Sequence, residues 1–260
     1  MSAEVAPAAG LMQGERVGLW ARFRRDQPWW LLPLTVVVVL GAFTGYTLWT
    51  MFFGPGPNHV SQAGPYLSPF FSPLLWKTGP VTPAIWVLWA PLSFRFTCYY
   101  YRKAYYRSFL WDPPACAVGE LRHRRYRGES RLPMALNNLH RFTWFPSAIV
   151  VVFLWIDAVA SLDYQGHLYL GVGTLILFVN CALLSGYSGG CHAFRHMAGG
   201  GLDCFSCMRG GRARFQLWRG VSVLNMRHAT WAWVSMFSVI LAEVYVRLLQ
   251  AGMPDPHHLF

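Results

Sequence analysis

The chain has 260 residues, of which 54% are hydrophobic and only 13% are charged, and its formal net charge is +11. This composition excludes an ordinary water-soluble domain, because so few charged side chains cannot cover a globule of this size. Nucleic acid is not needed as a partner to explain the net charge, since membrane topology and contact with anionic membrane lipids account for it.

Five apolar segments predict five transmembrane helices. The first, Trp29 to Phe53, is uncharged and, at about 1.5 Å per residue, is long enough to cross roughly 30 Å of hydrocarbon. The other four are Val81 to about Tyr101, about Leu136 to Val159, Gly166 to about Phe194, and about His228 to Leu249. The predicted fold is therefore an all-α polytopic membrane bundle.

The basic residues predict the orientation of this bundle. Nineteen of the 22 Lys and Arg residues lie in three stretches, which run from Met1 to Pro28, from Arg95 to Arg131 and from Arg195 to Arg227. Because Lys and Arg are retained on the cytoplasmic side, all three stretches are expected there. Residues 1–28 then form a cytoplasmic segment, either a short interfacial helix or a basic tail. Residues 29–250 form the five-helix domain, and residues 251–260 form an outer tail.

Two histidines at the cytoplasmic ends of predicted spans indicate a haem site. His140 lies near the start of the third span and His228 opens the fifth, so their depths match. In an up-down bundle these spans can be diagonal, which would let two imidazoles bind a haem iron from opposite faces. Arg141 and Arg227 adjoin them and are candidates for the haem propionates. The simpler alternative is a pair of hydrogen-bonded interfacial histidines.

A second haem site is predicted on the outer side. His59 follows the first span and His167 opens the fourth, again at matching levels. His192 and His196, on the cytoplasmic side, are alternative haem ligands that compete with the inner pair.

The stretch from Cys191 to Cys207 offers a different kind of site. His192 and His196 are one helical turn apart, and Cys204 and Cys207 form a C-x2-C pair, so the four side chains could bind zinc. A disulfide between these cysteines is not expected in the reducing cytosol.

Several segments carry a family resemblance. They are Phe94-Arg-Phe-Thr-Cys-Tyr-Tyr-Tyr-Arg-Lys-Ala-Tyr-Tyr-Arg-Ser-Phe, Pro113-Pro-Ala-Cys-Ala-Val, Arg127-Gly-Glu-Ser-Arg-Leu-Pro, Asn138-Leu-His-Arg-Phe and Gly190-Cys-His-Ala-Phe-Arg-His. With them, the chain resembles the membrane-anchor, cytochrome b type subunit of succinate dehydrogenase or fumarate reductase, in the five-span form of actinobacteria. The likeness extends from about Trp29 to Leu249.

The resemblance implies an electron-transfer subunit in a bacterial cytoplasmic membrane. A flavoprotein subunit and an iron-sulfur subunit, which carry the FAD and the iron-sulfur clusters, would dock on the cytoplasmic face. This chain would bind one or two b-type haems and pass electrons to menaquinone or ubiquinone, with hydride chemistry left to a partner. One departure is that relatives with two haems place ligands on the first two spans, which contain no histidine here. A non-redox transporter or scaffold with the zinc site is the alternative function.

Quinone requires an apolar pocket with one or two donors for its carbonyl oxygens. Residues at the cytoplasmic span ends supply the candidate lining, which is Ser93, Arg95, Tyr99, Asn137, Arg141, Arg227 and Trp231.

Overall fold

The computed structural model describes residues 28, 30–54, 60–76, 81–109, 134–199, 202 and 204–255. Helices dominate this part of the chain, as predicted, and run in the order α2 (Leu31–Phe52), α3 (Ala84–Thr97), α4 (Tyr99–Phe109), α5 (His140–Ala160), α6 (Val172–Gly189), α7 (His192–Gly199), α8 (Gly211–Asn225) and α9 (His228–Gln250). Two short 3-10 helices are η1 (Pro69–Phe71) and η3 (Met134–Leu139). Two small antiparallel hairpins pair β1 (Gln62–Ala63) with β2 (Tyr66–Leu67), and β3 (Asp163–Tyr164) with β4 (His167–Leu168).

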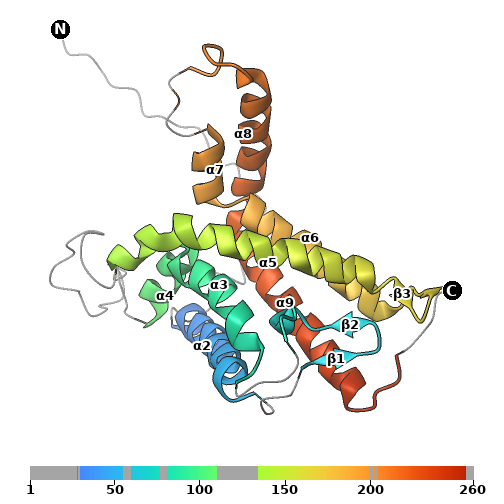
Figure 1. Ribbon diagram of the computed structural model, residues 1–260. Coiled ribbons are helices and arrows are strands. Elements are labelled where there is room, and N and C mark those ends of the chain that lie inside the picture. The colour runs from blue at the N-terminus through green and yellow to red at the C-terminus, as the bar shows by residue number, and fades with distance from the viewer. Residues whose placement is uncertain are drawn as a thin grey trace, which may run out of the picture.

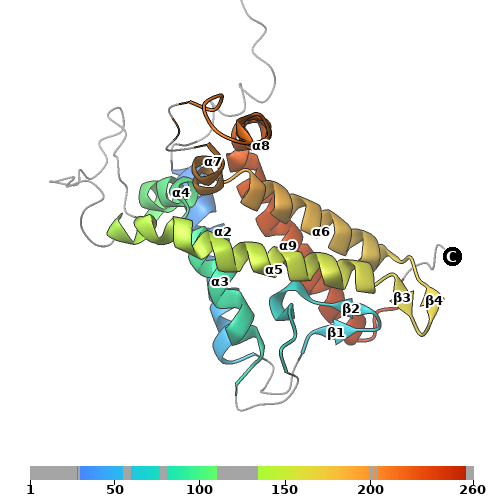
Figure 2. The same cartoon turned by 45° about the horizontal axis from the view of Figure 1, so that its top comes forward.

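Four of these helices are long and apolar enough to cross a membrane, namely α2, α5, α6 and α9. Helices α5, α6 and α9 cross one another in the bundle, and α2 lies beside α3 (Figures 1 and 2). Close approach of α6 to α9 depends on Gly186, because a Cβ atom there would lie 2.8 Å from the ring of Trp231. The small side chain lets the two helices pack tightly, as in other membrane bundles.

The predicted second span is shorter in the structure than in the sequence analysis. Helix α3 has 14 residues, and the extended backbone of Cys98 (ψ 130°) separates it from α4. At about 1.5 Å per residue it measures roughly 21 Å, less than the thickness of the hydrocarbon core. The described part of the chain therefore has four helices of spanning length where five were predicted.

The predicted fourth span, Gly166 to Phe194, was too long at both ends. Gln165 and Gly166 adopt positive φ angles in the β3–β4 turn, so the helix begins only at Val172. At the other end the helix stops at Gly189, and Cys191 separates it from α7. Positive φ angles end regular helix, which explains the late start.

Helices α7 and α8 form a hairpin that projects from one end of the bundle (Figure 1). Phe205 in their connection packs on Phe215 and Trp218 of α8. Cys204 and Cys207 in the same connection are joined by a disulfide, here called the hairpin disulfide. The sequence analysis did not expect this bond. Helix α9 begins at His228, where the fifth span was predicted to begin.

The opposite end of the bundle is fastened by a carboxylate, here called the Asp255 clasp. Asp255 Oδ1 accepts a hydrogen bond from Tyr245, and Oδ2 accepts from Tyr66 and Tyr169, with donor–acceptor distances of 2.6, 3.1 and 2.7 Å. The three tyrosines come from α9, β2 and the residues after β4. The clasp thus ties the segment after α9 to both hairpins.

Candidate functional site

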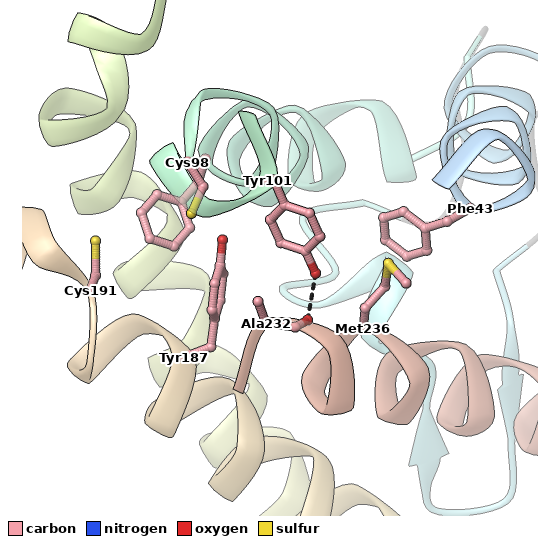
Figure 3. Packing of buried hydrophobic residues seen from close by; sticks show 8 residues of the cluster. Phe43, Cys98, Tyr101, Tyr187, Cys191, Ala232 and Met236 are labelled. Carbon is pink, nitrogen blue, oxygen red and sulfur yellow. Dashed lines mark hydrogen bonds between the residues drawn. The ribbon is translucent and has the colours of Figure 1, made fainter. Parts of the chain in front are cut away.

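Four side chains that commonly bind metals gather at the end of the bundle that carries the α7–α8 hairpin. They are Cys98 between α3 and α4, His140 at the start of α5, Cys191 between α6 and α7, and His228 at the start of α9. Each lies at a helix boundary, and their side-chain contacts bring the four boundaries together. Cys98 and Cys191 are free thiols, 1% exposed, in the same buried cluster (Figure 3).

The distances pair each histidine with a cysteine. His140 Nε2 lies 3.1 Å from Cys191 Sγ, and His228 Nε2 lies 3.7 Å from Cys98 Sγ. The other ring nitrogen of His140 contacts the Thr97 hydroxyl at 3.1 Å, while Nδ1 of His228 is buried without a hydrogen-bond partner. Both imidazoles therefore direct Nε2 at a sulfur atom, which fixes the orientation of four potential ligands.

Two aromatic rings hold the imidazoles in place. Phe94 is stacked on His140 with an interplanar angle of 4° and ring centroids 4.5 Å apart. Tyr187 is stacked on His228 with an angle of 12° and centroids 5.0 Å apart. The Tyr187 hydroxyl points toward Cys98 and has no hydrogen bond of ordinary geometry (Figure 3). Such packing limits rotation of both imidazole rings.

A cavity of about 940 Å³ opens onto this cluster, and its volume lies within the range of roughly 300–1,000 Å³ that is usual for ligand pockets. It is lined by Thr97, Cys98, Tyr99, Tyr100, Asn138, His140, Arg141, His192, Ala193, His196, Met197, Asn225, Met226, His228 and Ala229. The cavity brings together the inner histidines that the sequence singled out.

The donor set contains ligands suited to an iron-sulfur centre as well as the two histidines predicted to bind haem. In the described part of the chain, no three His, Cys, Asp or Glu side chains lie close enough to share one metal ion. A binuclear [2Fe–2S] cluster needs only two protein ligands for each iron, and a set of two histidines and two cysteines satisfies it. A haem bound by His140 and His228 would require both Nε2 atoms to face the iron, whereas here each faces a cysteine sulfur.

Buried beside the cluster is Arg95, whose side chain is 7% exposed. Its guanidinium donates to Tyr101 Oη at 2.9 Å, to the Ala232 carbonyl at 3.1 Å and to Ser235 Oγ at 2.9 Å. Its Cζ atom lies 4.6 Å from the centroid of the Tyr187 ring. An ionisable group at this depth usually has a specific role, because burying a charge among apolar helices is costly.

The residues predicted to bind quinone do not all line the same pocket. Ser93 and Arg95 line an apolar groove of about 840 Å³ between α2, α3, α4 and α9, with Phe43, Trp89, Phe96 and Tyr101 among its other walls. Tyr99 lines the cavity instead. Trp231 is packed against Gly186, and its Nε1 has no partner. The side chain of Asn137 lies outside the described residues.

Arg141 and Arg227 both lie near the cavity. Arg141 lines it, with its guanidinium 4.8 Å from the Phe142 ring. Arg227 is exposed at the N-terminal cap of α9, next to the lining residues Met226 and His228. Their role beside the haem propionates stays a prediction.

On the outer side, the predicted pair is not brought into a common site by the described residues. His167 is exposed on the β3–β4 hairpin, and His59 lies outside the described residues. The second haem stays a prediction.

The zinc alternative is not formed. His192 and His196 are exposed on α7 and line the cavity, but Cys204 and Cys207 are bonded to each other in the hairpin disulfide. No thiolate pair is left for zinc.

The sequence analysis did not single out Cys98 and Cys191 as candidate ligands. They are 93 positions apart and follow no ligand spacing, so no local motif reveals them. Only their predicted depth in the membrane could have revealed them. Cys98 and Cys191 lie near the cytoplasmic ends of the predicted second and fourth spans, at the same level as His140 and His228.

The apolar helices, the converging ligands and the cavity define a class of protein, a polytopic helical membrane protein with a prospective metal centre at one end. The profile of the family described as actinobacterial succinate dehydrogenase subunit SdhC matches residues 31–252. The chain belongs to this family and is a succinate dehydrogenase membrane-anchor subunit.

A solved structure supports this assignment. The chain is similar to one in the Mycobacterium smegmatis Sdh1 complex in the apo form, with a TM-score of 0.77 and 33% sequence identity. The match covers 95% of this chain and 98% of the other. No curated protein matches the chain. The resemblance predicted from the sequence is thus confirmed at the level of family.

Proposed function

We propose that this chain carries electrons through the membrane anchor of a succinate dehydrogenase, from an iron-sulfur subunit to quinone. The observation that carries the proposal is the convergence of Cys98, His140, Cys191 and His228 at one end of the bundle. Two histidines and two cysteines suit a [2Fe–2S] cluster, which supplies one-electron transfer when bound. The residues of this chain hold and orient that group, and hydride chemistry belongs to a flavoprotein partner.

The basic charge supports a cytoplasmic position for the cavity. The hairpin end of the bundle, where the cavity lies, also carries described arginines, and Lys and Arg are retained inside. These arginines are Arg141, Arg195, Arg209, Arg212, Arg214, Arg219 and Arg227. In this proposal the N-terminus is cytoplasmic, the C-terminus is outside, and α3 together with the residues that flank it completes five crossings of a bacterial cytoplasmic membrane. The flavoprotein and iron-sulfur subunits dock on the cavity side.

For the quinone, we propose the apolar groove that contains Ser93 and Arg95. Its walls are largely aliphatic and aromatic, which suits an isoprenoid tail, and its lining includes Arg95, whose guanidinium can donate to a quinone oxygen. Tyr187 links Arg95 to His228, because it contacts both the guanidinium and the imidazole. The groove therefore reaches close to the proposed redox centre.

A haem b bound by His140 and His228 is the second candidate for the redox centre. The observation in its favour is the cavity of about 940 Å³ that both histidines line. It would need the imidazoles to turn away from Cys191 and Cys98.

Spectroscopy of the purified complex separates the candidates. An iron-sulfur centre would give iron with acid-labile sulfide and an EPR signal on reduction that no cluster of the partner subunits explains. This signal should disappear in each of Cys98→Ser, His140→Asn, Cys191→Ser and His228→Asn. A haem would instead give b-type absorption bands that survive both cysteine substitutions. Cys181→Ser is the matched control, since Cys181 is also a buried free thiol but belongs to another cluster. Absence of both signatures from the anchor refutes the proposed electron-transfer role.

A further inference from the structure

Arg95 carries a positive charge inside the bundle that no described carboxylate balances. Its three hydrogen-bond acceptors are a hydroxyl of Tyr101, a backbone carbonyl of Ala232 and a hydroxyl of Ser235, all of them neutral. Within the described part of the chain, the buried carboxylate of Glu243 pairs with Arg247 and not with Arg95. Burying an ion without a counterion is costly. The charge is also weakly screened there, so it acts on neighbouring groups.

The nearest prospective redox group is the one held by His228. The guanidinium lies 4.6 Å from the Tyr187 ring centroid, and that centroid lies 5.0 Å from the His228 ring, so the cation is within about 10 Å of the imidazole. Phe43 and Tyr101 also flank the guanidinium at 6.0 and 5.8 Å. The surroundings are therefore aromatic, and in them charges interact more strongly than in water.

We infer that Arg95 tunes the midpoint potential of the redox centre held by His228. This inference rests on the proposed function, because it needs a centre at that position. One-electron reduction adds one negative charge to the centre, and a fixed positive charge stabilises the reduced form. Arg95 therefore raises the midpoint potential, which favours acceptance of electrons from the iron-sulfur subunit.

The size of the effect follows from the charge separation. A unit charge at about 10 Å, with an effective dielectric constant of about 20, changes the equilibrium constant of a one-electron reduction by about tenfold. A tenfold change corresponds to about 59 mV for one electron. Arg95→Gln should lower the midpoint potential by about this amount.

The test is a potentiometric titration of the purified complex, followed by EPR or absorption at the centre. Arg95→Lys keeps the charge and should stay close to wild type, while Arg95→Gln should shift downward. Arg219→Gln removes the same charge from an exposed position on α8 and should leave the potential unchanged. An unshifted potential in Arg95→Gln overturns the inference, as does an equal shift in Arg95→Lys.

A second pair of variants covers the case in which Arg95→Gln does not assemble. Ser235→Asp places a carboxylate beside the Arg95 nitrogen that Ser235 now contacts at 2.9 Å, and Ser235→Asn introduces the same shape without charge. A lower potential in the Asp variant than in the Asn variant supports the inference, and equal potentials refute it. If the wild-type anchor shows no centre at all, the proposed function fails instead, so the two failures are distinguishable.

Discussion

The Asp255 clasp gives the sharpest stability prediction. Asp255 accepts three tyrosine hydroxyls at 2.6 to 3.1 Å, which joins the segment after α9 to both outer hairpins. Tyr66 is 1% exposed, so a broken bond would leave its hydroxyl without easy access to water. Asp255→Asn keeps the shape of the side chain, but an amide oxygen accepts at most two of the three bonds, and the amide nitrogen cannot accept any.

The cost can be estimated from these bonds. A hydrogen bond to a charged group contributes about 1.5–3 kcal/mol. Asp255→Asn loses one bond and the charge, so local opening of the clasp should become easier by about 1.5–3 kcal/mol, or about 10- to 150-fold. Asp255→Ala loses all three and should cost more. Hydrogen exchange measured by mass spectrometry on the residues after α9 and around β4 detects this as faster exchange.

The matched control is Asp163→Asn in the same outer region. Asp163 is exposed, and its described hydrogen bond is from the Gly166 backbone N–H at 3.1 Å, so its replacement should change exchange little. Equal exchange rates in wild type and Asp255→Asn would show that the three hydroxyl bonds contribute nothing to closure of the clasp.

Three other predictions can be tested on the same preparations. Gly173→Ala should destabilise the outer end by about 1–3 kcal/mol, because its Cβ would lie 2.6 Å from the Tyr66 ring. Gly220→Ala is the control and should not destabilise the protein, because a Cβ there meets open space. Thermal unfolding of both variants checks this. In complex purified without reductant, outside the reducing cytosol, the hairpin disulfide should protect its two cysteines from alkylation until a reductant is added, and mass spectrometry showing label before reduction would contradict it. Burial and the hydrogen bond to Asp255 raise the pKa of Tyr169, so its contribution to stability is complete below about pH 10 and is lost as the pH rises further. Wild type should therefore lose more stability between pH 8 and 11 than Tyr169→Phe, and parallel losses would contradict the assignment.

Much of the fold was readable from hydropathy. The uncharged run that forms α2 and the start of α9 at His228 were both predicted closely, because a span must satisfy length and composition along one continuous segment. The second span was predicted too long, since hydropathy does not register the extended backbone at Cys98. The start of α6 was missed for a similar reason, because the positive φ angle of Gln165 is imposed by a hairpin and not by the residue type.

For the site, the sequence by itself determined the residue types, their depth and the family. It singled out His140 and His228 because ionisable residues at span ends are conspicuous in an apolar chain. Only the tertiary structure decided their partners. Cys191 and Cys98 approach His140 and His228 through helix packing between residues 51 and 130 positions apart, and Arg95 lies against the Tyr187 ring, which is stacked on His228. Such contacts depend on which helix faces are packed together, and that choice is made by the whole bundle and not by any local pattern.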